Sequence, residues 1–196
     1  VPFKIYASLD SAVDTKTVTE KNGATLKTVW EEGDQILGFY EKDGILAEYP
    51  ITFTVDPADP SAGEFTGTVP PEILKDDGSK YNWYFVYGAT DHTASSGVAV
   101  VEISNSQSQD PTNDVAHIGD FNCPMYGKVL NLSGPIFPRV QMTHLATLHE
   151  VTVQNKTQDN TKSGAKAGNI VVYSFAVSTP TQGSWDKSNR INLTGT

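Results

Sequence analysis

Short segments in which apolar and polar residues alternate recur along this chain, and they limit the folds available to it. Alternate side chains of a β-strand point to opposite faces of a sheet, so each such segment predicts a strand with one buried face. No long stretch has the period of an amphipathic helix. About nine of these segments, with turns about every ten residues, predict an all-β fold, a β-sandwich of about seven to nine strands.

The first segment, residues 1–9, has the cleanest alternation (VPFKIYASL). Its apolar face is Val1, Phe3, Ile5, Ala7 and Leu9. Pro2 indicates a sheet edge or a strand end, because proline lacks the N–H that a ladder needs. The other predicted strands are residues 26–31, 35–40, 51–55, 64–69, 81–87, 98–103, 140–153 and 170–177. The polar stretches 10–24, 104–119 and 155–169, and the pair Asp91-His92, are predicted as loops.

Two of these strands carry more detailed predictions. Residues 81–87 place four aromatic side chains on one face, namely Tyr81, Trp83, Phe85 and Tyr87. Such a stripe is typical of a core, and a sugar-binding platform is the alternative. In residues 140–153 most apolar residues occupy even positions up to Leu148 and odd positions from Val151. This shift of one residue indicates a bulge or a strand that passes from one sheet to another.

A sharp corner is predicted between residues 26–31 and 35–40. Gly33 allows a positive φ, and Asp34 can accept a hydrogen bond from nearby backbone. Trp30, Gly33 and Asp34 are therefore interpreted as a structural corner that Trp30 anchors. The alternative is that the carboxylates beside this tryptophan bind a sugar or a cation.

Composition excludes several classes of protein. The 196 residues carry a net charge of −9, which argues against nucleic acid or an anionic membrane as a partner. No apolar run approaches the roughly 20 residues of a transmembrane span. Cys123 is the single cysteine, so no intramolecular disulfide forms. Because the chain starts at Val1, we expect a mature chain that has lost an export signal.

The chain length fits one main domain. We predict a β-sandwich domain over residues 1–179, followed by a terminal hairpin or linker at residues 180–196. The later segment is rich in Pro, Gly and Asn.

No catalytic motif is found, and we expect no enzyme, no cofactor and no metal. His144 and His149 would face opposite sides of a strand, and His144 lies on an apolar face that is typical of a core histidine. His117, Asp120 and Cys123 have ligand-like spacing but no helix signal, so a metal there is the weaker interpretation. A Ser-His-Asp triad and a glycosidase carboxylate pair have no support in the sequence. Ligand-binding residues are not identified.

A series of loose motifs, in a fixed order, resembles the N-terminal domain of Bacteroidales-type fimbrillins, the subunits of type V pili and related surface proteins. The likeness covers residues 1–177, and its most specific motif is W-x-x-G-D-x-I at Trp30–Ile36. The other motifs are Lys16-Thr17, Tyr84–Tyr87, Val100–Ser104 with Gln107 and Gln109, Pro124–Gly127, and His144-Leu145 with Glu150–Val153.

This resemblance implies a transthyretin-like β-sandwich, export as a lipoprotein precursor, and a place at the cell surface on the outer membrane or in a fimbria. It implies a structural or adhesive pilus subunit or tip protein that assembles by strand exchange with other subunits or with itself. The exchangeable strand would be residues 1–9, with Lys16 and Lys21 in a processing loop after it. The alternative is an ordinary, permanent first strand.

The sequence departs from the family pattern in two ways. Its only arginines, Arg139 and Arg190, do not follow the first strand, whereas the best-known members are cleaved after arginine. Family members also usually carry a further C-terminal β-domain, so we expect this chain to be either an isolated domain or a shorter relative. A non-polymerising surface module that binds a host protein or glycan is therefore the alternative function. Trp185 is its one candidate for an exposed aromatic, and a core role is the alternative for this residue. Asp10-Ser11-Ala12 resembles a short O-glycosylation signal of exported proteins.

Overall fold

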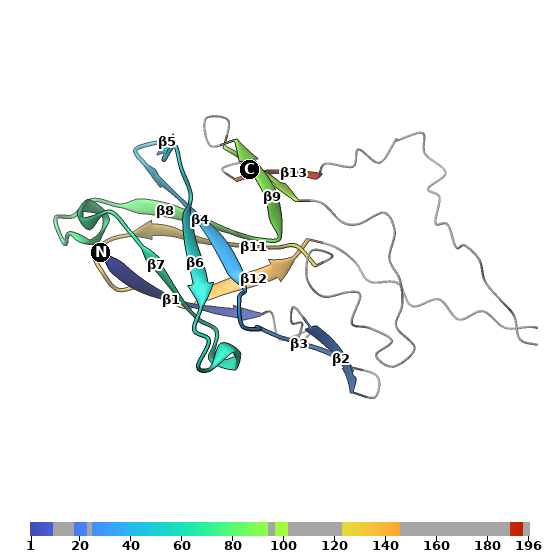
Figure 1. Cartoon of the computed structure of the whole chain (residues 1–196). Helices are drawn as coiled ribbons and strands as arrows, with labels where there is room; N and C mark the ends of the chain where they lie inside the picture. The colour runs from blue at the N-terminus through green and yellow to red at the C-terminus, as the bar shows by residue number, and fades with distance from the viewer. Residues whose placement is uncertain (10–17, 23–24, 94–96, 102–122, 146–188, 194–196) are drawn as a thin grey trace, which may run out of the picture. The chain divides into compact units, whose positions relative to one another are not determined.

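The computed structural model describes residues 1–9, 18–22, 25–93, 97–101, 123–145 and 189–193 (Figure 1). These residues form strands and two short 3₁₀ helices, so the predicted all-β class is confirmed. The first-sheet strands are β1 (Pro2–Leu9), β4 (Gln35–Lys42), β5 (Ile45–Leu46), β6 (Ile51–Val55), β7 (Glu64–Thr68), β8 (Tyr81–Tyr87), β11 (Met125–Leu132) and β12 (Val140–His144). The remaining elements are β2 (Val18–Asn22), β3 (Thr25–Val29), β9 (Ala89–Thr93), β10 (Val98–Val101), β13 (Asn189–Asn192), η1 (Pro60–Ala62) and η2 (Pro71–Leu74).

The main sheet has the strand order β5-β4-β6-β7-β1-β12-β11-β8. Because β4 also pairs with β8, seven of these strands form a closed, barrel-like ring, and β5 pairs with β4 outside it. β1 and β12 run parallel, while the other strand pairs of the ring are antiparallel. β12 joins the ring through three residue pairs with β1 and two with β11.

The inside of the ring is a dense apolar core. The predicted aromatic stripe of β8 is confirmed, because all four of its side chains are buried in this core. The rings of Trp83 and Phe85 stack with their centroids 5.8 Å apart, and Phe137 meets Trp83 edge-on at 5.2 Å. Phe53 of β6 lies 6.3 Å from Trp83. The core therefore depends mainly on aromatic contacts within β8 and between β8 and residues of nearby segments.

The ring has no room for a side chain at two glycines beside Phe53. A Cβ atom added at Gly38 of β4 or at Gly67 of β7 would lie 2.7 Å from a carbon of the Phe53 ring. The flat ring of Phe53 thus fills the space that these two glycines leave open, and close packing of this kind specifies one arrangement of the strands.

A second apolar cluster covers the outer face of β4 and β8. Phe39 and Tyr84 pack there with Val101 of β10 and with Leu193, which directly follows β13. Strands β13, β10 and β9 form a separate three-stranded sheet in that order. β4 and β8 are therefore buried on both faces, which explains why their sequences are almost continuously apolar or aromatic.

Two predicted loops contain strands. β2 lies within residues 10–24 and pairs with β3, and β9 contains Asp91 and His92. Both segments are polar, so their strands are set by cross-strand pairing instead of by an apolar face. The sequence Asn22-Gly23 between β2 and β3 is a local signal for a tight hairpin. β11 was not among the predicted strands, because Gly127 and Asn131 interrupt its alternation.

The chain divides into two units, Val1–Ala146 with Asp186–Thr196, and Thr147–Trp185. The second unit lies outside the described residues. So do the predicted domain boundary at residues 179 and 180, the strand 170–177 and the parity shift before Val151, which stay predictions.

Candidate functional site: the first strand and its surroundings

The inner face of β1 belongs to the core, as its alternation predicts. Ile5 and Ala7 are fully buried, and Phe3 and Leu9 are partly buried and pack against the same core. Phe3 meets Phe137 edge-on at 5.4 Å. Val1 departs from the prediction, because 52% of its surface is exposed. It precedes the strand, which begins at Pro2 in agreement with the predicted strand end.

The two halves of β1 pair with different neighbours. Residues 2–6 pair antiparallel with β7, in the register Ile5 opposite Phe65. Residues 7–9 pair parallel with β12, in the register Ala7 opposite Val140. The N–H of Ala7 also donates to the carbonyl of Gly63, at 2.8 Å. β1 is therefore the strand that joins β7 to β12 and closes the ring.

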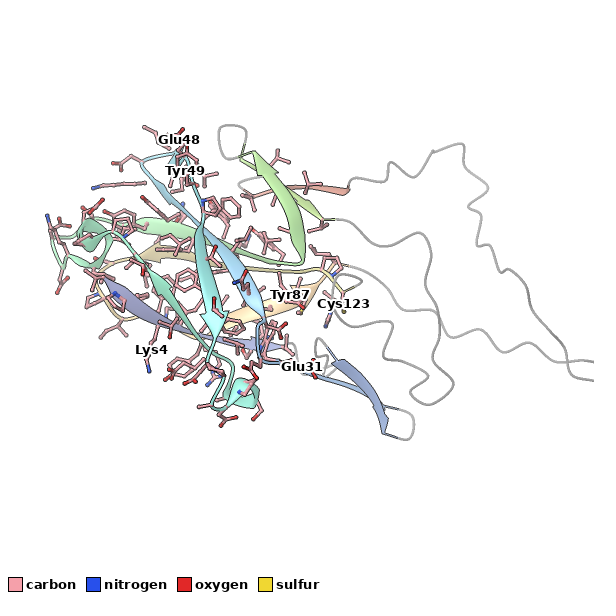
Figure 2. All side chains as sticks on the ribbon, in the orientation of Figure 1. Lys4, Glu31, Glu48, Tyr49, Tyr87 and Cys123 are labelled. Carbon is pink, nitrogen blue, oxygen red and sulfur yellow. The ribbon has the colours of Figure 1, made fainter. Side chains whose placement is uncertain are left out.

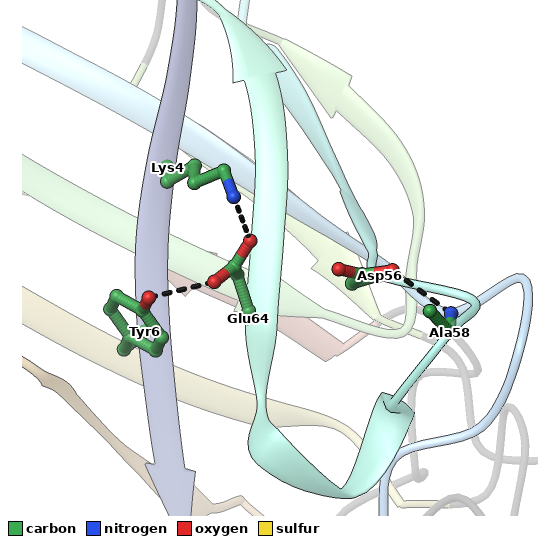
Figure 3. A network of polar contacts seen from close by, with 5 residues as sticks. All are labelled: Lys4, Tyr6, Asp56, Ala58 and Glu64. Atoms are coloured by element: carbon green, nitrogen blue, oxygen red, sulfur yellow. Dashed lines mark hydrogen bonds and ion pairs between the residues drawn. The ribbon is translucent and has the colours of Figure 1, made fainter.

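On its outer face β1 is tied to β7 by a polar group that we call the Glu64 clasp (Lys4, Tyr6 and Glu64; Figure 3). The Lys4 ammonium lies 2.5 Å from one oxygen of Glu64, and the Tyr6 hydroxyl donates to the other at 2.7 Å. The hydrogen bond from Lys4 lowers the pKa of Glu64. The Arg139 guanidinium lies 5.4 Å from the centre of the Tyr6 ring. Exposed pairs of this kind align strands more than they stabilise them.

The predicted processing loop is only partly described. Lys16 lies outside the described residues, whereas Lys21 lies in β2, opposite Leu26 of β3. The prediction that Lys21 lies in a loop is therefore wrong, because residues 18–22 pair with β3 along their whole length.

The corner prediction for Trp30, Gly33 and Asp34 agrees with the structure. Trp30 is 4% exposed and contacts Tyr87 edge-on, with the centroids 5.4 Å apart. Gly33 has φ of +93°, which favours glycine. The Asp34 carboxylate accepts hydrogen bonds from the Glu31 N–H at 2.7 Å and the Tyr87 hydroxyl at 3.3 Å. Asp34 thus holds the turn and joins it to β8.

A pocket of about 400 Å³ opens beside this corner, lined by acidic residues and by the end of β8. Figure 2 shows Glu31 and Tyr87, which both line it. Asp34, also in the lining, has its two carboxylate oxygens in the hydrogen bonds described above. The Asp34 carboxylate therefore acts in the structure of the corner, while Glu31 and Glu32 also line the pocket.

Cys123 and His144 form a close pair that sequence reasoning missed. The Cys123 sulfur lies 3.1 Å from Nδ1 of His144, although 21 positions separate the two residues. Cys123 precedes β11 and His144 ends β12, and these strands place Met125 opposite His144. Only the pairing of β11 with β12 could have revealed this contact, and β11 was not predicted as a strand. The prediction of a core histidine agrees with the half-buried position of His144.

The environment of this pair favours its neutral form. Burial raises the pKa of the Cys123 thiol to about 11 and lowers the pKa of His144. A catalytic thiol needs the opposite shift, because the thiolate is the nucleophile. The pair therefore has the spacing of a cysteine–histidine dyad without its activation.

The raised thiol pKa predicts a loss of stability at alkaline pH. The folded state keeps the proton of Cys123 up to about pH 11, whereas the unfolded thiol releases it near 9.0. Stability is therefore complete below pH 9 and falls as the pH rises from 9 to 11, by about 1–3 kcal/mol. Urea unfolding at several pH values should show this loss in the wild type and not in Cys123→Ser. Parallel curves for the two proteins would contradict the prediction.

Several predicted residues cannot be assigned a role from the structure. His117, Asp120, His149 and Trp185 lie outside the described residues, as does Asp10-Ser11-Ala12. Within the described part of the chain, no three side chains of the types His, Cys, Asp and Glu are grouped so that they could hold a metal ion. The described residues also contain no helix long and apolar enough to cross a membrane.

Comparisons of the chain with protein-family models, with curated proteins and with solved structures give no match.

Proposed function

We propose that the chain is a structural or adhesive cell-surface subunit whose first strand is exchangeable, as in type V fimbriae. The observation that supports this is the position of β1 between β7 and β12, with its inner side chains in the core. Removal of one strand from a closed ring leaves a groove one strand wide. An extended segment of another subunit can enter such a groove by main-chain pairing, with alternate side chains in the vacated pockets.

The proposal includes the finer fold prediction, a transthyretin-like sandwich. Its support is the sequence resemblance together with the all-β fold and the shared aromatic core of the ring. In this arrangement the partners are copies of the chain or other pilus subunits. The place of the protein would be the outer membrane or a fimbria, reached as a lipoprotein precursor.

The pattern of burial in β1 defines which segments would fit the groove. The position of Ala7 accepts only a small side chain, because it is 2% exposed and pairs with Val140 beside Gly63. The position of Ile5 is fully buried and accepts an aliphatic side chain. A charged residue at this position would be buried without a partner, which is strongly unfavourable.

The test is to cleave the full chain after its first strand and to add a peptide that can replace this strand. A recognition site for a sequence-specific protease is inserted within residues 10–17, and the cleaved protein is incubated with a labelled peptide of residues 1–9. We expect the cleaved protein to take up the peptide, and the matched peptide with Ile5→Asp to fail. Uncleaved protein is the control and should take up neither peptide.

Assembly is measured on the same samples by size-exclusion chromatography and electron microscopy. Oligomers or filaments in the cleaved protein would support a polymerising subunit. A cleaved protein that remains a folded monomer and rejects the wild-type peptide would overturn the proposal.

A further inference from the structure

The residues that carry sulfur in this chain are placed near one histidine by β11 and β12. The sequence contains one cysteine and two methionines. Cys123 contacts His144, Met125 pairs with His144 across β11 and β12, and Met142 precedes His144 by two residues on the same face of β12. Both methionines are fully buried, and Cys123 is 3% exposed. We call these four residues the sulfur cluster.

We propose that the sulfur cluster binds one soft monovalent metal ion, Cu(I), with Cys123 and His144 as the main ligands and the methionine thioethers beside them. Thiolate, thioether and imidazole are the ligands that select Cu(I). Zn²⁺ takes four ligands in structural sites, and Ca²⁺ and Mg²⁺ take oxygen ligands. The described residues supply neither set at this place.

The backbone holds the two main ligands in place. The N–H of Leu145, the residue after His144, donates to the carbonyl of Pro124, the residue after Cys123, at 2.9 Å. The thiol and the imidazole therefore sit on two segments that are fixed to each other. Such preorganisation lowers the entropic cost of binding. Nε2 of His144 is buried and has no hydrogen-bond partner, so no second hydrogen bond fixes the tautomer of this imidazole.

Binding exchanges a proton for the metal. The Cys123 thiol releases its proton to solvent, its sulfur forms a bond to Cu(I), and the lone pair of Nδ1 of His144 completes the main coordination. Binding requires the side chains of Cys123 and His144 to rotate, so that Sγ and Nδ1 move apart from 3.1 Å and the ion can lie between them. No electron is transferred in this step.

The probe is Ag(I), a monovalent soft ion that does not change oxidation state in air. Native mass spectrometry of the full chain should show one ion per chain. Ag(I) should raise the Tm by a few degrees, because the folded state offers Cys123 and His144 together whereas the unfolded chain offers a bare thiol. Zn²⁺ at the same concentration should leave the Tm unchanged.

Three variants distinguish binding by the sulfur cluster from binding by the Cys123 thiol alone. Cys123→Ser should abolish binding, and His144→Gln should weaken it at least tenfold. Met142→Leu conserves volume and should weaken it several-fold with the fold intact. Lys128→Ala, at an exposed position of β11, is the control and should bind as the wild type does.

The proposal would be overturned if the wild type bound no Ag(I), or if it bound Zn²⁺ more tightly than Ag(I). It would also be overturned if both His144→Gln and Met142→Leu bound Ag(I) with wild-type affinity. If Cys123→Ser does not fold, as judged by near-UV circular dichroism, the two other variants decide the outcome.

Discussion

Replacement of Phe53 by alanine is expected to destabilise the protein by about 3–5 kcal/mol. The Phe53 ring is fully buried between the walls of the closed sheet, where it contacts the rings of Trp83 and Phe85. Strands on both sides fix its surroundings, so the cavity cannot collapse fully and the cost of lost contacts is added to that of lost burial. Urea unfolding followed by tryptophan fluorescence measures the change, and a loss below 1 kcal/mol would contradict it.

The glycines beside Phe53 allow a sharper form of this test. Gly38→Ala should cost about 1–3 kcal/mol in the wild type, because the new Cβ would lie 2.7 Å from the Phe53 ring. In a Phe53→Leu background the same change should cost clearly less, since the 2.7 Å contact is gone and the 3.1 Å contact with the Phe85 ring remains. A double-mutant cycle measures this coupling. Additive losses would show that the glycine is not required by the ring.

Gly127→Ala is expected to destabilise the protein by about 3 kcal/mol and to loosen the closure of the ring. A Cβ atom at Gly127 of β11 would lie 2.7 Å from the backbone oxygen of Gln141 and 2.9 Å from a methyl carbon of Val140, both in β12. A backbone atom cannot rotate away, so β12 must shift as a whole. Because β12 has only five residue pairs in the ring, the shift should break its pairing with β1.

Hydrogen exchange locates this effect. Amides of residues 7–9 and 140–144 should exchange faster in Gly127→Ala, while those in the β4–β8 pairing keep their protection. Lys128→Ala changes the next, exposed residue and should alter stability by less than about 0.5 kcal/mol. Equal loss of protection in all strands would show that the glycine supports the whole core instead of this junction.

The strands that sequence alone predicted are those whose burial follows a simple rule. β1, β6 and β7 alternate between core and solvent, and β8 is marked by its aromatic residues, so periodicity identified all four. The corner at Trp30–Asp34 was also predictable, because its turn needs glycine and a backbone-binding carboxylate. These elements carry their own local signal.

The remaining elements depend on partners that are distant in the chain. β9 and β2 are polar, and their strand state is a property of the pairs that they form. The closure of the sheet by β4 and β8 cannot be read from either strand alone. The contact of Cys123 with His144 needs the register of β11 against β12, which no local pattern encodes. The sequence therefore predicted the pieces of the site but not their contacts.

The parallel pairing of β1 with β12 sets the order in which the chain can fold. Hairpins such as β2–β3 and β9–β10 join neighbouring segments and can form as soon as those segments are available. The first strand, however, has no parallel partner until residues 140–142 have been made. Contacts of such long sequence separation form slowly, and the apolar face of β1 stays open to wrong partners meanwhile. Because β1 is made before every other described strand, it needs protection longest, so the yield of folded protein should depend on holding β1 apart from other chains.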